Sequence, residues 1–78
     1  MNIAQAVDRV DSFRDLGHDW DSYKGKLISL KAIDAAKDLL YKLGDGWTPV
    51  PCRDGSVQLE RHADGLYIEI VVSEVDLI

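Results

Sequence analysis

The sequence has few of the residues that form disulfide bonds, membrane-spanning helices and signal peptides. Its 78 residues include one cysteine, Cys52, and no apolar run near the roughly 20 residues that a membrane-spanning helix needs. A lone cysteine excludes an internal disulfide, and the N-terminus shows no basic segment followed by a long apolar one, as a signal peptide would. These absences favour a cytoplasmic protein.

Recognisable catalytic motifs are also missing. The chain has no Walker A loop, no GxGxxG, no GxSxG and no CxxC. Cys52 with His18 or His62 lacks a third group to orient the pair, and His18-Asp19 with Asp21 are near neighbours in a loop without a ligand geometry. We therefore expect no enzyme activity, no cofactor and no metal site.

Positive charge is in short supply. Fourteen Asp and Glu residues face nine Lys and Arg residues, for a net charge of −5. Direct binding to nucleic acid is disfavoured because it depends on basic side chains that neutralise phosphates. A basic protein surface is a compatible partner. With 46% apolar and 29% charged residues, the composition is that of one globular domain over residues 1–78.

The stretch SVQLERHADGLYIEIVV, residues 56–72, organises the predicted fold. Its alternating apolar residues predict strands at about 56–62 and 65–72, and Asp64-Gly65 between them is typical of a tight hairpin turn. A second Asp-Gly, at 54–55, predicts a turn before these strands. Pro49 and Pro51 restrict a third strand, about 47–52, to an edge of the sheet.

Two amphipathic helices are predicted, over residues 3–16 with Asn2 as N-cap and 30–43 with Ser29 as N-cap, joined by a loop at 17–28. The order of elements predicts an α+β fold in which two helices pack on one face of a three-stranded antiparallel β-meander. The second helix should cover the hairpin. The residues expected to be nearly inaccessible beneath it are Ile33, Leu40, Leu59, Ile68 and Ile70.

The last predicted strand is apolar on both faces, with Tyr67 and Val71 on one and Ile68 and Ile70 on the other. Helices can cover only one of these faces. The other is either an exposed apolar patch or the contact with a second chain, and we favour a homodimer.

Acidic and aromatic residues of the N-terminal third form the predicted partner-binding site. Three aspartates share a stripe of the first helix, and two more follow in the loop beside two aromatic side chains. The residues of this site are Asp8, Asp11, Asp15, Asp19, Trp20, Asp21 and Tyr23. Two alternatives remain open: the stripe is a solvated helix face, and the aromatics seal the edge of the core.

Part of the chain, residues 19–72, resembles a group of small bacterial and phage proteins of unassigned function. Their approximate pattern is W-D-x-Y-G-A-x-P-I-S, a helix, P-x-x-D-G-x-V-x-L-E-W and an L-x-I-E-I strand. The chain departs from it at Leu27, where the pattern has proline, and at Arg61, where it has tryptophan. The matching residues are Trp20, Asp21, Tyr23, Ile28, Ser29, Ile33, Pro51, Asp54, Gly55, Val57, Leu59, Glu60, Ile68, Glu69 and Ile70.

The resemblance implies a phage or mobile-element setting in a bacterial host cell, without implying an activity. Together with small size and negative charge, it leads us to expect a protein-binding module. Such a module would inhibit by occupying a basic surface of a larger host complex, for example one that binds nucleic acid, as an anti-CRISPR protein does. The alternative is an antitoxin or accessory regulatory subunit that neutralises a co-expressed partner.

Overall fold

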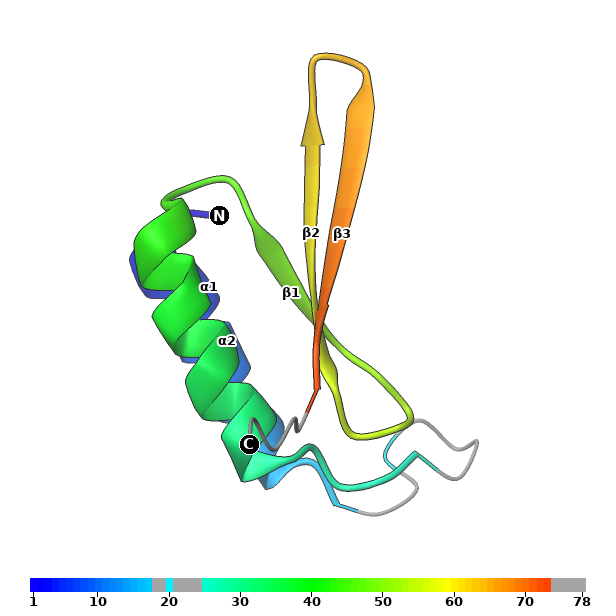
Figure 1. Ribbon diagram of the computed structural model, residues 1–78. Helices are drawn as coiled ribbons and strands as arrows, with labels where there is room; N and C mark the ends of the chain where they lie inside the picture. The colour runs from blue at the N-terminus through cyan, green and yellow to red at the C-terminus, as the bar shows by residue number, and fades with distance from the viewer. Residues whose placement is uncertain (18–19, 21–24, 74–78) are drawn as a thin grey trace, which may run out of the picture.

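The structure, a computed structural model, describes residues 1–17, 20 and 25–73. A three-stranded antiparallel sheet in the order β1-β2-β3 carries two helices on one face, which confirms the predicted α+β fold (Figure 1). The elements are α1 (Ile3–Ser12), the 3-10 turn η1 (Phe13–Asp15), α2 (Leu30–Leu43), β1 (Thr48–Pro51), β2 (Val57–Ala63) and β3 (Leu66–Val72).

Both helices begin where the sequence predicts. The side chain of Asn2 accepts from the backbone N–H of Gln5 at 2.8 Å, and the Gln5 side chain accepts in return from the Asn2 backbone at 3.1 Å. This reciprocal capping satisfies two N–H groups that the first turn of a helix leaves unpaired. Ser29 caps α2. The first helix is shorter than predicted, because the α-helical bonding ends at Ser12 and one 3-10 turn continues to Asp15.

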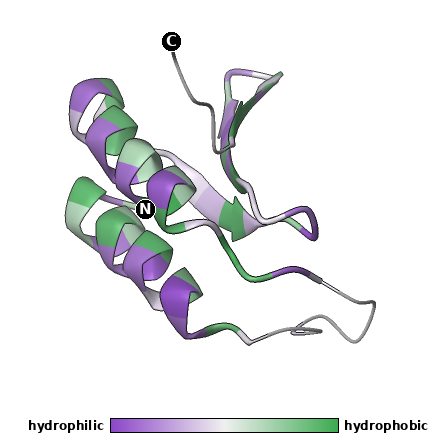
Figure 2. Cartoon of the chain, turned by 60° about the horizontal axis from the view of Figure 1, so that its bottom comes forward, coloured by the Kyte–Doolittle hydropathy of each residue, from purple (hydrophilic) through white to green (hydrophobic). Residues whose placement is uncertain are grey.

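The helices run antiparallel and side by side as one layer (Figure 2). Two bonds join the start of α1 to the turn after α2. The Ile3 backbone N–H donates to the Asp45 carboxylate at 2.8 Å, and the Gly46 N–H donates to the Met1 carbonyl at 2.8 Å. A helix N-terminus attracts negative charge, so Asp45 also stabilises α1 electrostatically.

Strand β1 lies at one edge of the sheet, as its prolines predict. The Cys52 N–H donates to the Ser56 carbonyl at 3.0 Å, and the register pairs Val50 with Gln58. Backbone groups of an antiparallel strand alternate in direction, so Val50 points its N–H at β2 while Pro49 and Pro51 point their nitrogens away from it. The outward carbonyl of Pro49 accepts from Arg9 Nε of α1 at 2.7 Å.

Strands β2 and β3 form the predicted hairpin. Ala63 pairs with Leu66, leaving Asp64 and Gly65 as a two-residue turn with φ of 52° and 78°. Positive φ at both turn residues is the type I′ geometry, which matches the twist of the strands.

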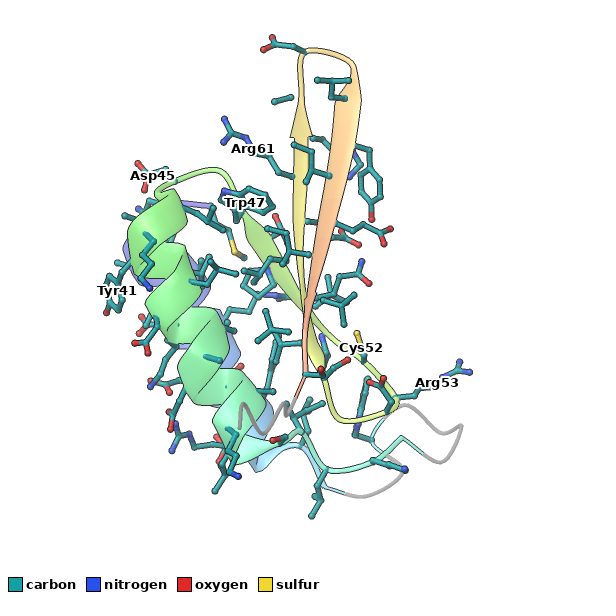
Figure 3. The ribbon with its side chains drawn as sticks, viewed as in Figure 1. Tyr41, Asp45, Trp47, Cys52, Arg53 and Arg61 are labelled. Atoms are coloured by element: carbon teal, nitrogen blue, oxygen red, sulfur yellow. The ribbon has the colours of Figure 1, made fainter. Side chains whose placement is uncertain are left out.

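The core lies between the helix layer and the half of the sheet that is farther from the Asp64-Gly65 turn (Figure 1). Figure 3 shows Trp47 between the helices and the sheet, with Arg61 of β2 beside it. The Arg61 guanidinium carbon lies 5.9 Å from the centre of the Trp47 ring. The buried apolar residues of the core are Ala6, Val10, Phe13, Ile28, Ala32, Ile33, Ala36, Leu40, Trp47, Val57 and Leu59.

The prediction that Ile68 and Ile70 of β3 are nearly inaccessible was wrong. Ile33, Leu40 and Leu59 are inaccessible as expected, but Ile68 exposes 44% of its surface and Ile70 is half-buried. The reason is length: the hairpin extends well past the end of the helix layer, so nothing in the described chain covers its far half (Figure 1). Within the described residues, no helix combines the length and apolar character needed to cross a bilayer.

Candidate interaction surfaces

The acidic stripe of α1 is interrupted at its centre. Asp8 and Asp15 are exposed, but the Asp11 carboxylate lies 2.7 Å from Arg14 Nη2 and 2.8 Å from Lys37 Nζ of α2. Hydrogen bonding to Lys37, helped by Arg14, lowers the pKa of Asp11, and the same bond raises the pKa of Lys37. The stripe therefore offers a partner two exposed carboxylates, and a third that already joins α1 to α2.

Trp20 takes a structural position. Its indole N–H donates to the Lys26 carbonyl at 2.8 Å, and its half-buried ring packs against the core. This geometry favours the interpretation in which the aromatic seals the core edge. Asp19, Asp21 and Tyr23 of the predicted site lie outside the described residues, so the site as a whole stays a prediction.

A second acidic surface lies on the face of the sheet that the helices leave uncovered. Glu60 of β2 stands directly opposite Glu69 of β3. The Tyr67 hydroxyl donates to Glu60 Oε1 at 3.0 Å, and Gln58 Nε2 donates to the same oxygen at 2.8 Å. We call this set, with the exposed Val71 beside it, the acidic sheet face: Gln58, Glu60, Tyr67, Glu69 and Val71.

Electrostatics on the acidic sheet face are unfavourable for folding. Like charges directly opposite each other in a sheet are destabilising. In the described part of the chain, neither Glu60 nor Glu69 forms an ion pair with a basic side chain. Hydrogen bonding to Glu69, then burial and bonding to Glu60, raises the pKa of the Tyr67 phenol. A cationic side chain from outside would relieve the repulsion between the two carboxylates.

Sequence reasoning missed the Glu60–Glu69 pair, although the signal was available. A two-residue turn at Asp64-Gly65 fixes the register of the hairpin, so residues at equal distances from the turn face each other. Counting outward from that turn brings Glu60 opposite Glu69.

The far half of the hairpin carries a third surface, which is apolar. Leu66, Tyr67, Ile68 and Val71 expose 66%, 47%, 44% and 57% of their surfaces. Leu66 and Ile68 lie on the helix-facing side and Tyr67 and Val71 on the other, so both faces of β3 are apolar and exposed. Exposed apolar patches of this kind mark contact sites.

Chemistry-bearing groups are sparse. Cys52 is a half-buried free thiol at the end of β1, whereas His62 is exposed on the hairpin and stacks on Tyr67, with ring centres 4.5 Å apart. A shallow hollow of about 350 Å3 beside the hairpin turn is lined by residues 62–67. Within residues 1–17, 20 and 25–73, no three His, Cys, Asp or Glu side chains come together as metal ligands.

Comparison of the chain with protein-family models, with curated proteins and with solved structures finds no match in any of the three.

Proposed function

We propose that this protein is a small acidic binding module that acts by occupying a basic surface of a larger protein, with the acidic sheet face as its main contact. The observation that carries the proposal is the Glu60–Glu69 pair. Two facing carboxylates lie on a face that no described element covers, beside the exposed Tyr67 and Val71. Such a face offers a Lys or Arg of a partner both charge and an aromatic surface.

The setting we propose is inhibition inside a bacterial host cell, in the manner of an anti-CRISPR protein. A host protein that holds nucleic acid arranges Lys and Arg residues for phosphates. Facing carboxylates compete for the same cations, so binding would displace the nucleic acid. The resemblance to small phage proteins and the net charge of −5 support this setting. If the captured partner is instead encoded beside this protein and is toxic alone, the role is that of an antitoxin.

No catalytic step belongs to this proposal, and it requires no cofactor and no direct contact with nucleic acid. The α1 stripe is the rival contact, because Asp8 and Asp15 are also exposed carboxylates. The two faces lie on different layers of the molecule, α1 in the helix layer and the Glu60–Glu69 pair on the uncovered face of the sheet. They can therefore be tested separately.

The experiment uses two charge reversals of equal size. The partner is first captured from host cells with the tagged protein and identified. Glu60→Lys with Glu69→Lys alters the sheet face, and Asp8→Lys with Asp15→Lys alters the α1 stripe by the same change in net charge. Two lysines opposite each other repel as two glutamates do. Because Glu60→Lys also removes the acceptor of the Tyr67 and Gln58 hydrogen bonds, urea unfolding first verifies that the sheet variant is folded.

Affinity is then measured at two salt concentrations. We expect the sheet variant to bind about 100-fold more weakly or worse, and the α1 variant to change mainly the association rate. Loss confined to the α1 variant would move the contact to that stripe. Undiminished affinity in both folded variants would refute binding through carboxylates.

A stability measurement separates function from folding. Glu69→Gln removes one of the two facing charges, and we expect it to stabilise the unbound protein by about 0.2–1 kcal/mol. The same variant should bind the partner less tightly. A loss of stability instead would mean that Glu69 serves the fold.

A further inference from the structure

The two edges of the sheet are unequal. At β1 the outward positions are the two prolines, which have no N–H to donate, and Arg9 occupies the outward carbonyl of Pro49. These are the devices by which natural proteins block an edge strand. The sheet is therefore closed to strand addition at β1.

At β3 the edge is open. Ala63 and Leu66 flank a two-residue turn and so form a hydrogen-bonded pair. Alternation along the strand then directs the backbone groups of Leu66, Ile68, Ile70 and Val72 toward β2. The β1–β2 register leads to the same assignment, because Gln58 and Glu60 already face β1. Tyr67, Glu69 and Val71 consequently direct their N–H and C=O groups outward, and no backbone bond from the described residues reaches them.

We propose that the β3 edge is the interface between two copies of this chain, which pair antiparallel across a two-fold axis at Ile68 and form one six-stranded sheet. In this register Ile68 faces Ile68 of the second copy, Leu66 faces its Ile70, and Tyr67 faces its Glu69. The outward groups at 67 and 69 then meet each other as hydrogen-bonded pairs.

Charge selects this register over its neighbour. An axis at Glu69 would place two glutamates directly opposite each other, beside the Glu60 that each already faces. Like charges in that position are destabilising. An axis at Ile68 instead pairs each Glu69 with an uncharged tyrosine, and places the exposed aliphatic side chains of Leu66 and Ile68 against Ile70 and Ile68 of the second copy.

A second copy also supplies the cover that the hairpin lacks. Antiparallel pairing brings the exposed Leu66 of one chain beside Ile70 of the other, which packs at the edge of the helix-covered core. Leu66, Tyr67 and Ile68 of each copy are covered only on the side that faces the second copy. Pairing along a single strand edge therefore gives an interface at the small end of specific interfaces, below about 1,200 Å2.

The first test is the mass of the protein in solution from about 1 to about 200 µM, the range suited to an interface of this modest size. We expect a concentration-dependent shift from 8.7 kDa to twice that mass. Glu69→Pro removes an outward N–H without touching the bonds to β2, and should raise the dissociation constant about 100-fold or more. Its control, Glu69→Ala, keeps the N–H and should still dimerise.

The second test reads the register. Ile68→Cys in a Cys52→Ala background should form a disulfide with its own copy under mild oxidation, because facing residues in a non-hydrogen-bonded pair have Cα atoms about 4.5 Å apart. Ile70→Cys in the same background should stay uncrosslinked, since it faces residue 66 of the second copy. A single-chain mass at every concentration, a folded Glu69→Pro that still dimerises, or crosslinking at 70 in place of 68 would each overturn the proposal. A single-chain mass at every concentration would indicate instead that the β3 edge pairs with a strand of another protein.

Discussion

Gly55 is the residue at which a single methyl group should damage the fold most cleanly. It sits in the Asp54-Gly55 turn with φ of +90°, and its carbonyl accepts from the Ser29 N–H at 2.9 Å. Ser29 is the N-cap of α2. The turn therefore fixes the start of the covering helix against the sheet, and Lys26 N–H adds a bond to the Arg53 carbonyl at 2.8 Å.

The magnitude for Gly55→Ala has two parts. A side chain at positive φ costs about 1–2 kcal/mol. In addition, a Cβ built at Gly55 would lie 2.8 Å from the Leu27 carbonyl oxygen, which is too close for any real contact. Because the obstacle is backbone, the loop must move and the Ser29 bond weakens, for about 1–2 kcal/mol more. We expect a total loss of about 2–4 kcal/mol, a large fraction of a small domain's stability.

Gly65→Ala is the matched control. Gly65 has φ of +78°, but a Cβ there meets nothing within 4 Å, so only the conformational cost of about 1–2 kcal/mol applies. Urea unfolding of both variants at one protein concentration gives the difference directly. In a thermal melt, each kcal/mol corresponds to about 4–8 °C for a domain of this size. Equal losses in the two variants would refute the claim that the Leu27 carbonyl leaves no room at Gly55.

Two further predictions concern the core and the pairing of the helices. Leu40→Ala empties a fully buried site beneath α2 and should cost about 2–5 kcal/mol by urea unfolding; an unchanged midpoint would contradict the helix-on-sheet packing. Asp11→Asn should make the free energy of unfolding less dependent on pH in the acid range. Because the folded state lowers the pKa of Asp11 below 3.8, its ion pair with Lys37 stabilises the protein above that pH and is lost as the pH falls through the folded value. A variant curve parallel to the parent curve below pH 3.8 would argue against this pair.

Local signals in the sequence were sufficient to predict where the helices begin, where the hairpin turns and which strand lies at an edge. Asn2 and Ser29 begin the helices because their side chains satisfy free N–H groups. Asp64-Gly65 makes the hairpin because both residues tolerate positive φ. The prolines place β1 at an edge because they have no N–H to donate to a second neighbouring strand. Each of these signals acts within a few residues, so no knowledge of the tertiary structure was needed.

The extent of burial could not be predicted in the same way. Alternation shows which residues of β3 share a face, but it carries no information on where the helix layer ends above that face. Ile68 was therefore expected in the core and lies outside it. For the same reason, the Asp11 stripe looked like a free acidic face, because its Lys37 partner is distant in the sequence and is brought near only by packing of α2 on α1.

The prolines of β1 also limit how far assembly can proceed. A sheet open at both edges is a template for endless addition of strands, which is how fibres grow. When β3 pairs with its copy, the outermost strand at each end is β1, where Pro49 and Pro51 offer no N–H to a newcomer. Growth would then stop at two chains, so a higher protein concentration would give more pairs and not a filament. A strand from another protein could pair with β3 only by displacing the second copy. Self-association would therefore set the concentration that this other strand needs in order to compete.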